Sequence, residues 1–195
     1  DNESKLWCWG YNPYGNLGVG DVNVRTSPSQ VEDIGDVLQV SIGQYLTCAL
    51  DSSWDVYCWG QNNMGQAGDS SLSNQLRPNL ISGLGDSRPT MVSAGNTFAC
   101  ALMENGSVAC WGGNNAGQLG IDSTVQSNEQ IQWSNLPQGV KASSISVGNS
   151  HACAIMDDYS LYCWGSNNYA QVGVGNTTDI LSPTQILDSS YEVVG

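Results

Sequence analysis

The sequence has 195 residues, of which only 12% are charged, and 18 acidic residues against five lysines and arginines give a formal net charge of −13. Nucleic acids and anionic membranes are bound mainly through cations that displace counterions, so this charge argues against both as partners. No apolar run approaches the roughly 20 residues of a membrane span, so we expect no membrane insertion, and no export signal is visible within this stretch. The length is sufficient to bury a sizeable core.

A Trp-Gly pair followed by a glycine-rich loop occurs four times along the chain. The tryptophans of these pairs are spaced by 50, 52 and 53 residues, at Trp9, Trp59, Trp111 and Trp164. Self-similarity at such a period predicts a solenoid, propeller or array, in which each repeat buries its faces against its neighbours. The approximate repeat units form a single array rather than separate domains: 1–37, 38–90, 91–143 and 144–195.

Two cysteines ten residues apart flank a turn in the last three repeats. In the third repeat the turn contains Asn105-Gly106, a strong hairpin signal because both residue types tolerate positive φ. A three-residue loop there places Cys100 opposite Cys110, and directly opposed residues have Cβ atoms about 4.5 to 5.5 Å apart, close to the span of a disulfide. We therefore predict three disulfides within repeats: Cys48–Cys58, Cys100–Cys110 and Cys153–Cys163.

Short β-rich runs surround each hairpin. Runs ending in glycine precede the first cysteine, at 40–43, 92–95 and 145–148. Outer strands opened by proline follow the glycine loops at 28–31, 78–81 and 183–186, and the third repeat has 129–131 without the proline. About four short antiparallel strands per repeat and no helical periodicity predict an all-β fold of β-propeller-type repeats, with about four blades and both ends cut within a blade.

The recurring pattern joins Ser-x-Gly, Cys-Ala-Leu, a turn, Trp-Gly-x-Asn-x-x-Gly-Gln-Leu-Gly and a later Pro-x-x-Val. This pattern resembles the regulator of chromosome condensation repeat over essentially the whole chain. The resemblance implies a propeller fold, and the best-known activity of that family is guanine nucleotide exchange on a small GTPase. The chain departs from the pattern at Asn16, where two other copies have glutamine, and at Ala170, which replaces a glycine. A histidine frequent in the family occurs only as His151, with Leu46 and Phe98 at the matching positions.

The cysteine pairs predict an extracellular or secreted protein, because three disulfides are hard to maintain in a reducing cytosol. Metal ligation is the alternative. Zinc sites usually have cysteines two to four apart with further Cys or His nearby, whereas this chain has one histidine and no such clustering. We therefore expect no metal and no cofactor. Cys8 has no partner within its repeat and is expected to be unpaired or bonded to another segment.

Residues able to support catalysis are few. His151 has no nucleophile or acid beside it in the sequence, and we expect it to pack structurally against the neighbouring blade. Asp21, Asp69 and Asp122 each follow a glycine loop, which suggests calcium, but the chain lacks a dense ladder of acidic ligands. Solvated turn residues are the favoured interpretation. We therefore expect no enzymatic activity.

The Trp-Gly tryptophans suit either a sugar-stacking platform or core packing, and their repeated place beside the hairpin favours the core. Trp54 and Trp133 lie outside the repeated positions and are the expected surface contacts. Three asparagines match the N-glycosylation pattern, although about three matches arise by chance in a chain so rich in Ser, Thr and Asn: Asn2, Asn105 and Asn176.

These features together predict a non-enzymatic extracellular module with a structural or protein-binding role. The expected partner is another protein or further copies of the chain, including a head-to-tail assembly or filament. One alternative is a secreted enzyme inhibitor that binds through a propeller face, and guanine nucleotide exchange is less favoured. The strand beside 6–9 is missing and 191–195 aligns with 40–43, so we expect the residues to belong to a longer propeller or a larger assembly.

Overall fold

The computed structural model describes residues 5–188 and residue 190, and within them the chain forms fourteen strands and no helix. The first sheet pairs β1 (Trp7–Gly10) with β2 (Arg25–Gln30). The second sheet contains β3 (Val37–Ile42), β4 (Leu46–Asp51), β5 (Val56–Gly60) and β6 (Gln75–Leu80). The third contains β7 (Pro89–Ala94), β8 (Phe98–Met103), β9 (Val108–Gly112) and β10 (Ser127–Trp133). The fourth contains β11 (Ala142–Val147), β12 (His151–Met156), β13 (Leu161–Gly165) and β14 (Ile180–Leu187).

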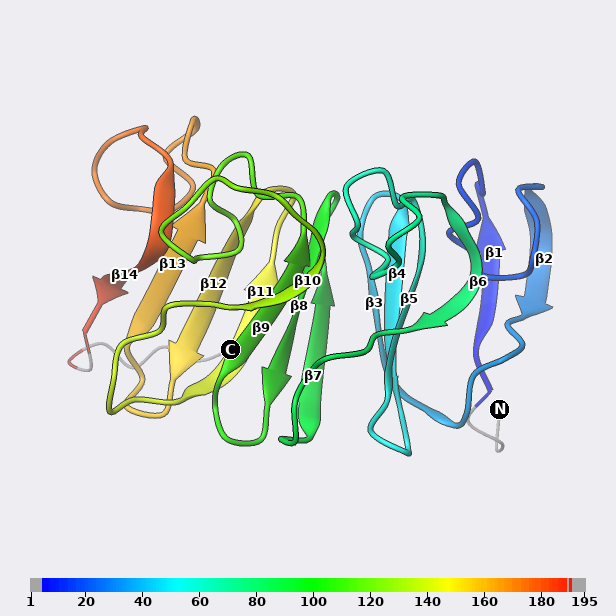
Figure 1. The fold of residues 1–195 in the computed structure, drawn as a ribbon, viewed down its shortest axis with the longest axis horizontal. Helices are drawn as coiled ribbons and strands as arrows, with labels where there is room; N and C mark the ends of the chain where they lie inside the picture. Colours follow the sequence, from blue (N-terminus) through cyan, green and yellow to red (C-terminus); the bar gives the residue numbers. More distant parts are fainter. Residues whose placement is uncertain (1–4, 189, 191–195) are drawn as a thin grey trace.

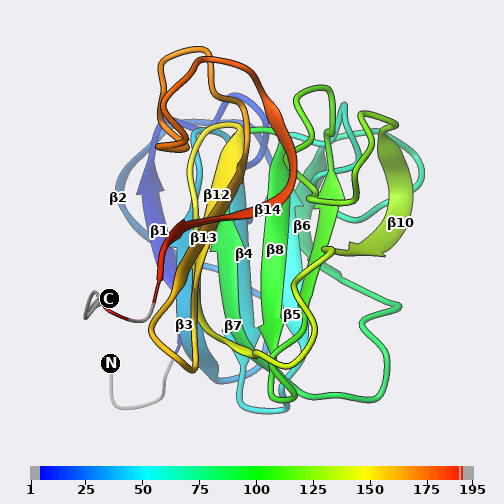
Figure 2. The same ribbon diagram turned by 90° about the vertical axis from the view of Figure 1, so that its left-hand side faces the viewer.

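Each four-stranded sheet is an antiparallel meander in which the strands follow one another in chain order. The sheets stand face to face in sequence order, as propeller blades do (Figure 1; Figure 2). In the third and fourth blades the innermost strand packs on the two inner strands of the blade before it, with β7 against β3 and β4, and β11 against β7 and β8. The predicted all-β, propeller-type fold is confirmed, and the described sheets form an open array. Among residues 5–188 and 190, no helix is long and apolar enough to cross a membrane.

The cysteine hairpins have the register that the third repeat predicted. Cys100 lies opposite Cys110, the amide of Met103 donates to the Ser107 carbonyl, and Gly106 has a φ of 84°. Because the hairpins of the second and fourth blades have the same register, all three cysteine pairs are bonded in the structure, each within one blade: Cys48–Cys58, Cys100–Cys110 and Cys153–Cys163.

The outer strands begin three residues earlier than the sequence suggested. Pro28, Pro78 and Pro183 occupy the fourth position of β2, β6 and β14 rather than the first. The pairing register of each of these strands with its neighbour shifts near the proline. A proline is tolerated there because an edge strand with a β-bulge leaves a residue that does not need to donate a ladder hydrogen bond.

The core lies between blades rather than within them. Trp111 and the Cys48–Cys58 pair belong to one buried cluster that joins the second and third blades, and Trp164 belongs to the next. Serine hydroxyls also join the inner strands, because the Ala94 amide donates to Ser41 Oγ and the Val147 amide donates to Ser93 Oγ. Each blade is therefore stabilised by the faces of its neighbours, as expected for a repeat array.

Candidate protein-interaction face

Four long loops lie at the same end of the array, at the top of Figure 1, opposite the hairpin turns. They connect the two outer strands of each blade and span residues 11–24, 61–74, 113–126 and 166–179. We call the surface that they form the loop face. Loops held by a rigid scaffold are where binding residues of propellers and other β proteins concentrate, so the packing and exposure of these four loops determine what the face can bind.

One buried asparagine holds each loop in shape. The Asn114 side-chain amide donates to the carbonyls of Ser123 and Val125 at 2.8 and 2.9 Å, and its Oδ1 accepts from the Leu119 amide at 3.0 Å. Asn12 and Asn167 make the corresponding three bonds, whereas Asn62 accepts from the Ala67 amide and donates to the Asp69 carbonyl alone. All four asparagines are fully buried. Because a buried polar group without partners is costly, this network makes each loop a preorganised structure. The Trp-Gly-x-Asn motif is its signal in the sequence.

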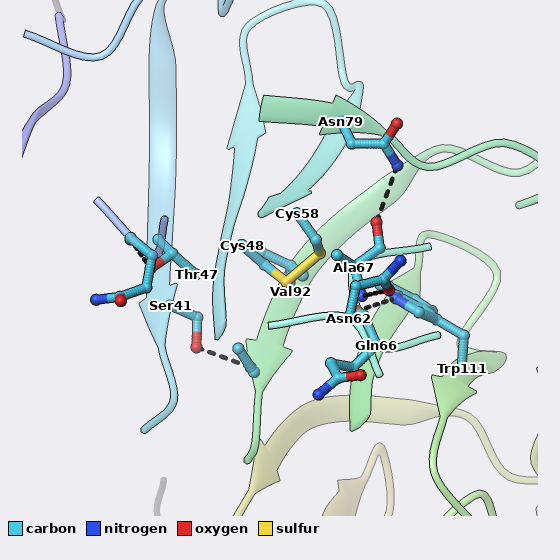
Figure 3. Close-up of a disulfide and its surroundings, with 12 residues drawn as sticks. Ser41, Thr47, Cys48, Cys58, Asn62, Gln66, Ala67, Asn79, Val92 and Trp111 are labelled. Atoms are coloured by element: carbon cyan, nitrogen blue, oxygen red, sulfur yellow. Dashed lines mark hydrogen bonds between the residues drawn. A yellow bond between two sulfur atoms is a disulfide. The ribbon is translucent and has the colours of Figure 1, made fainter. Parts of the chain in front are cut away.

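The Trp-Gly tryptophans attach each loop to the next blade. Trp111 Nε1 donates to the Gln66 carbonyl at 3.0 Å across the blade interface (Figure 3). Trp59 and Trp164 make the same bond to the loop of the blade before them and are fully buried. These three tryptophans have the core role that the sequence predicted. The prediction is wrong for Trp9, which is 60% exposed, because no blade among the described residues lies on that side of β1.

Apolar side chains protrude from the preorganised loops. Tyr169 is 90% exposed and Val125 is 72% exposed, each on a different loop. The other exposed large apolar residues of the loop face are Tyr11, Val22, Val24 and Leu72. Exposed apolar and aromatic side chains on a rigid frame are typical of protein-binding surfaces. Their exposure follows from the loop conformation and has no distinct signal in the sequence.

His151 lies at the start of β12, and its ring packs against Gly148. It is half-buried, and burial lowers its pKa below the ordinary value of 6.5, so the neutral form is favoured. Leu46 and Phe98 occupy the matching positions, opposite the glycine that ends the next strand. The ring therefore fills an apolar packing position.

Of the three aspartates that suggested calcium, Asp21 and Asp69 accept local bonds, whereas the Asp122 carboxylate accepts none from the described residues. Asp21 forms an ion pair with Arg25 at 2.7 Å, and Asp69 Oδ1 accepts from the Ser71 amide. Within residues 5–188 and 190, no group of three or more histidines, cysteines, aspartates and glutamates is placed to hold a metal ion.

Trp133 is 42% exposed, in line with the expectation that it lies at the surface. Trp54 is less exposed than expected. Trp54 is partly buried against the core cluster between the second and third blades, and Arg88 stacks on its ring with Cζ 3.9 Å from the centroid. Trp54 therefore packs between two blades and is only partly exposed.

Among the asparagines that match the glycosylation pattern, Asn105 is exposed at a hairpin tip, where its Oδ1 accepts from the Ser107 amide. Asn176 is exposed on the loop face, and its Oδ1 accepts from the Thr178 amide. Asn2 lies outside the described residues. Both described asparagines are accessible, and attachment of a glycan remains a prediction for each.

The surface charge is strongly negative. Four of the five cationic side chains are already within 4 Å of a carboxylate oxygen: Lys5, Arg25, Arg77 and Arg88. Most of the acidic side chains that the structure describes have no cation within this distance, and the whole sequence has a net charge of −13. Such a field attracts basic surfaces and repels polyanions.

A stacked array of antiparallel blades, joined through recurring positions of a repeat and carrying a loop face, defines a β-propeller protein-interaction module. Sequence models of the Regulator of chromosome condensation (RCC1) repeat match residues 3–50, 55–102 and 159–194, and a second model of the repeat matches 37–66, 92–118 and 142–171. The chain therefore belongs to the RCC1 repeat family. It is 32% identical over 189 residues to the ultraviolet-B receptor UVR8 of Arabidopsis thaliana, covering 94% of the chain and 42% of that receptor.

Solved structures show the same fold at low sequence identity. Human WBSCR16 has a TM-score of 0.85 at 21% identity, with 94% of this chain and 48% of that one covered. Prp20p of Saccharomyces cerevisiae, described with its binding properties to Gsp1p and histones, has a TM-score of 0.80 at 20% identity, covering 95% and 47%. The ectodomain of receptor kinase CR4 of Physcomitrella patens has a TM-score of 0.53 at 23% identity, covering 86% and 37%. The chain thus spans less than half the length of these proteins.

Proposed function

We propose that the chain is an extracellular, non-enzymatic protein-binding module that contacts its partner through the loop face. The observation that carries this proposal is the set of three cross-strand disulfides at the same position of successive blades. Disulfides form and persist in oxidising compartments and are rare in the cytosol. The similar fold of the CR4 ectodomain supports an extracellular setting for blades of this kind.

The partner that fits the loop face is a protein with a basic surface and an apolar depression. Its basic groups would meet the acidic field of this chain, which steers association, and its apolar depression would receive the exposed side chains of the loops. Tyrosines are favoured in such contacts because they bury a large area at a small cost in side-chain entropy. Tyr169, the most exposed large apolar residue of the face, is the expected central contact.

Two other functions are less well supported. A secreted inhibitor that covers the active site of a hydrolase would use the same loop face, and it becomes the preferred description if the captured partner is an enzyme. Guanine nucleotide exchange, the best-known activity of the family, would require a small GTPase as partner. The disulfides argue against it, because that activity belongs to a reducing compartment.

The experiment compares capture of partners from the native extracellular medium by three immobilised proteins. Tyr169→Ser removes the most exposed aromatic ring of the loop face. Tyr159→Ser removes an aromatic ring that is 55% exposed on a hairpin turn, at the opposite end of the blades, and serves as the matched control.

We expect one specific partner to be retained by the wild-type protein and by Tyr159→Ser, with affinity for Tyr169→Ser reduced about tenfold or more. Equal loss in both variants would place the contact elsewhere. Specific recovery of a cytosolic GTPase would overturn the proposal in favour of nucleotide exchange.

A further inference from the structure

The outer strand of each blade is a free edge of its sheet. β6, β10 and β14 each pair with one neighbouring strand, and β10 lies at the right-hand rim of the array in Figure 2. A sheet edge presents N–H and C=O groups that can pair with another strand, and proline is one of the residues that prevent such pairing. The outer strands differ in this respect, because β2, β6 and β14 each contain a proline and β10 has none.

The pairing register shows which residue of β10 takes the place of the proline. The second cysteine of each hairpin lies opposite an outer-strand residue, with Cys58 opposite Asn79 and Cys110 opposite Gln132. The residue just before this outer-strand position is Ile131 in the third blade and a proline in the other three, at Pro28, Pro78 and Pro183. The sequence pattern aligns 129–131 with the residues that follow the proline, whereas the register places Ile131 at the proline position itself.

The main-chain groups of Ile131 point away from its sheet. The Ser134 amide donates to the Val108 carbonyl at the end of β9 at a distance of 3.0 Å. Because the main-chain groups of a strand point alternately to its two sides, those of Gln132 also face β9, and those of Ile131 and Trp133 face outward. No other main-chain group among the described residues bonds to them. The third blade therefore presents an outward N–H donor where the other blades have a proline, which lacks one.

A hollow lined by two carboxylates adjoins this edge. A Cβ at Gly83 would lie 3.7 Å from Ile131 Cγ1, and a Cβ at Gly85 would lie 3.6 Å from Trp133 Cζ2, so both side chains face the segment that joins the second and third blades. The same two glycines line a hollow of about 360 Å³, together with Asp55, Leu84 and Asp86 among others. A strand added to β10 would direct every second side chain to the face on which Ile131 and Trp133 lie.

The hollow favours a cationic side chain. Asp55 and Asp86 are exposed, and neither has a lysine or arginine within 4 Å among the described residues. Arg88 is already engaged, because it stacks on Trp54 and pairs with Glu104 at 3.0 Å. The net charge of −13 adds a long-range attraction for cations to this local one.

We propose that the outward edge of β10 at 131–133 binds an extended basic segment of a partner protein as an added strand. Hydrogen bonds to the main-chain groups of Ile131 and Trp133 hold the segment, and a lysine or arginine of the segment enters the hollow beside Asp55 and Asp86. The inference is independent of the partner proposed for the loop face, because it concerns a different surface.

A second copy of the chain suits this edge less well. Pairing β10 with the same strand of another copy would bring together two chains that each have a net charge of −13, and like charges across an interface oppose association. Four of the five cationic side chains of a copy are already in ion pairs. A basic segment of a different protein meets the requirements of both the edge and the carboxylates.

The test titrates the protein with a synthetic peptide of alternating lysine and valine that is capped at both ends. Ile131→Pro gives the third blade the residue type of the other blades, so it removes the outward N–H without changing the charge. Ile131→Val keeps the N–H and is the matched control. Calorimetry measures the affinity, and hydrogen exchange reports on the amides of Ile131 and Trp133.

We expect the wild-type protein and Ile131→Val to bind the peptide with similar affinity and to show protection of both amides. Ile131→Pro is expected to bind about tenfold or more weakly, because proline removes a donor and its ring obstructs the edge. A peptide of alternating glutamate and valine is expected to bind the wild-type protein about tenfold or more weakly. Equal affinity of Ile131→Pro and the wild type, unprotected amides, or a wild-type dimer that Ile131→Pro disperses would each overturn the proposal.

A second pair of variants tests the carboxylates without altering the edge. Asp86→Asn removes a charge from the hollow, whereas Asp122→Asn removes a charge from an exposed position of the loop face. We expect Asp86→Asn to weaken binding of the lysine peptide about threefold or more, and Asp122→Asn to change it by less than about twofold. Equal effects of the two substitutions would show that the peptide responds to net charge alone, which would overturn the placement of the cation in the hollow.

Discussion

At the scale of single residues, the bond between a Trp-Gly tryptophan and the preceding loop is one of the contacts that connect successive blades. Trp111 Nε1 donates to the Gln66 carbonyl at 3.0 Å, and the ring is 1% exposed. Trp9 has the same place in its repeat but is 60% exposed. Substitutions at Trp111 and Trp9 therefore compare the same repeat position with and without a packed neighbouring blade.

Trp111→Phe is expected to lower the free energy of unfolding by about 2 kcal/mol or more, because it leaves a buried carbonyl without a donor and a small cavity beside it. Trp9→Phe is expected to change it by less than about 0.5 kcal/mol, since an exposed substitution away from any bond is nearly neutral. Urea unfolding of the two variants measures the difference. Equal losses would show that the indole bond across the interface does not stabilise the array.

His151 makes the stability depend on pH in a defined direction. Burial lowers its pKa in the folded state below the ordinary value of 6.5, so the unfolded state binds more protons between those two values. The stability contributed by neutral His151 is therefore fully present above about pH 6.5 and is lost as the pH falls toward the folded-state pKa.

The variant His151→Leu places the residue of the second blade at this position and removes the titration. We expect the free energy of unfolding of the wild-type protein, relative to this variant, to fall between pH 7 and pH 5. Parallel urea titrations at several pH values measure it. A difference that is constant with pH would contradict the assignment of a neutral, packed imidazole.

At the scale of elements, two of the three hairpins have a bulky residue at a turn position with positive φ, which glycine adopts more easily. The third hairpin has Gly106 in the left-handed conformation, whereas the equivalent residues of the second and fourth hairpins are Trp54 and Tyr159, with φ of 67° and 68°. A bulky residue at positive φ costs on the order of 1 kcal/mol. Trp54 recovers part of this cost by stacking with Arg88, while Tyr159 is 55% exposed.

Tyr159→Gly is expected to raise the free energy of unfolding by about 0.5 to 1 kcal/mol, because glycine adopts this conformation without strain. Trp54→Gly is the informative contrast. It relieves the same strain but removes the stacked ring, and we expect it to destabilise the protein. Thermal unfolding of both variants measures the effects, and a loss of stability for Tyr159→Gly would show that the turn is not strained.

The hairpins were predictable because their signals are local. A ten-residue cysteine spacing and the Asn105-Gly106 turn determine the register without reference to the rest of the chain. The prolines of β2, β6 and β14 were placed at strand starts because a bulge has no sequence signal distinct from a strand end. The exposure of Trp9 was not predictable from its motif, since burial depends on a neighbouring sheet and the motif specifies only the position on its own strand.

At the scale of the whole molecule, the array combines two kinds of surface. The repeated faces are specific for another blade of the same type, and the loop face varies from blade to blade over a constant asparagine framework. The loop face is the surface through which we propose that the array binds its partner. Each disulfide joins cysteines ten residues apart, and in the chain-entropy account closing such a loop stabilises the fold by about 2 to 3 kcal/mol.

We propose that the chain is a disulfide-stabilised module of an oxidising, extracellular compartment, and the state of its cysteines tests this proposal most directly. The most direct measurement is to isolate the protein from its native source, alkylate it under denaturing conditions without reductant, and count the modified cysteines by mass spectrometry with peptide mapping. The account predicts at most one alkylated cysteine, Cys8, with Cys48–Cys58, Cys100–Cys110 and Cys153–Cys163 recovered as bonded pairs. Alkylation of six or more cysteines, or bonds between different repeats, would contradict it.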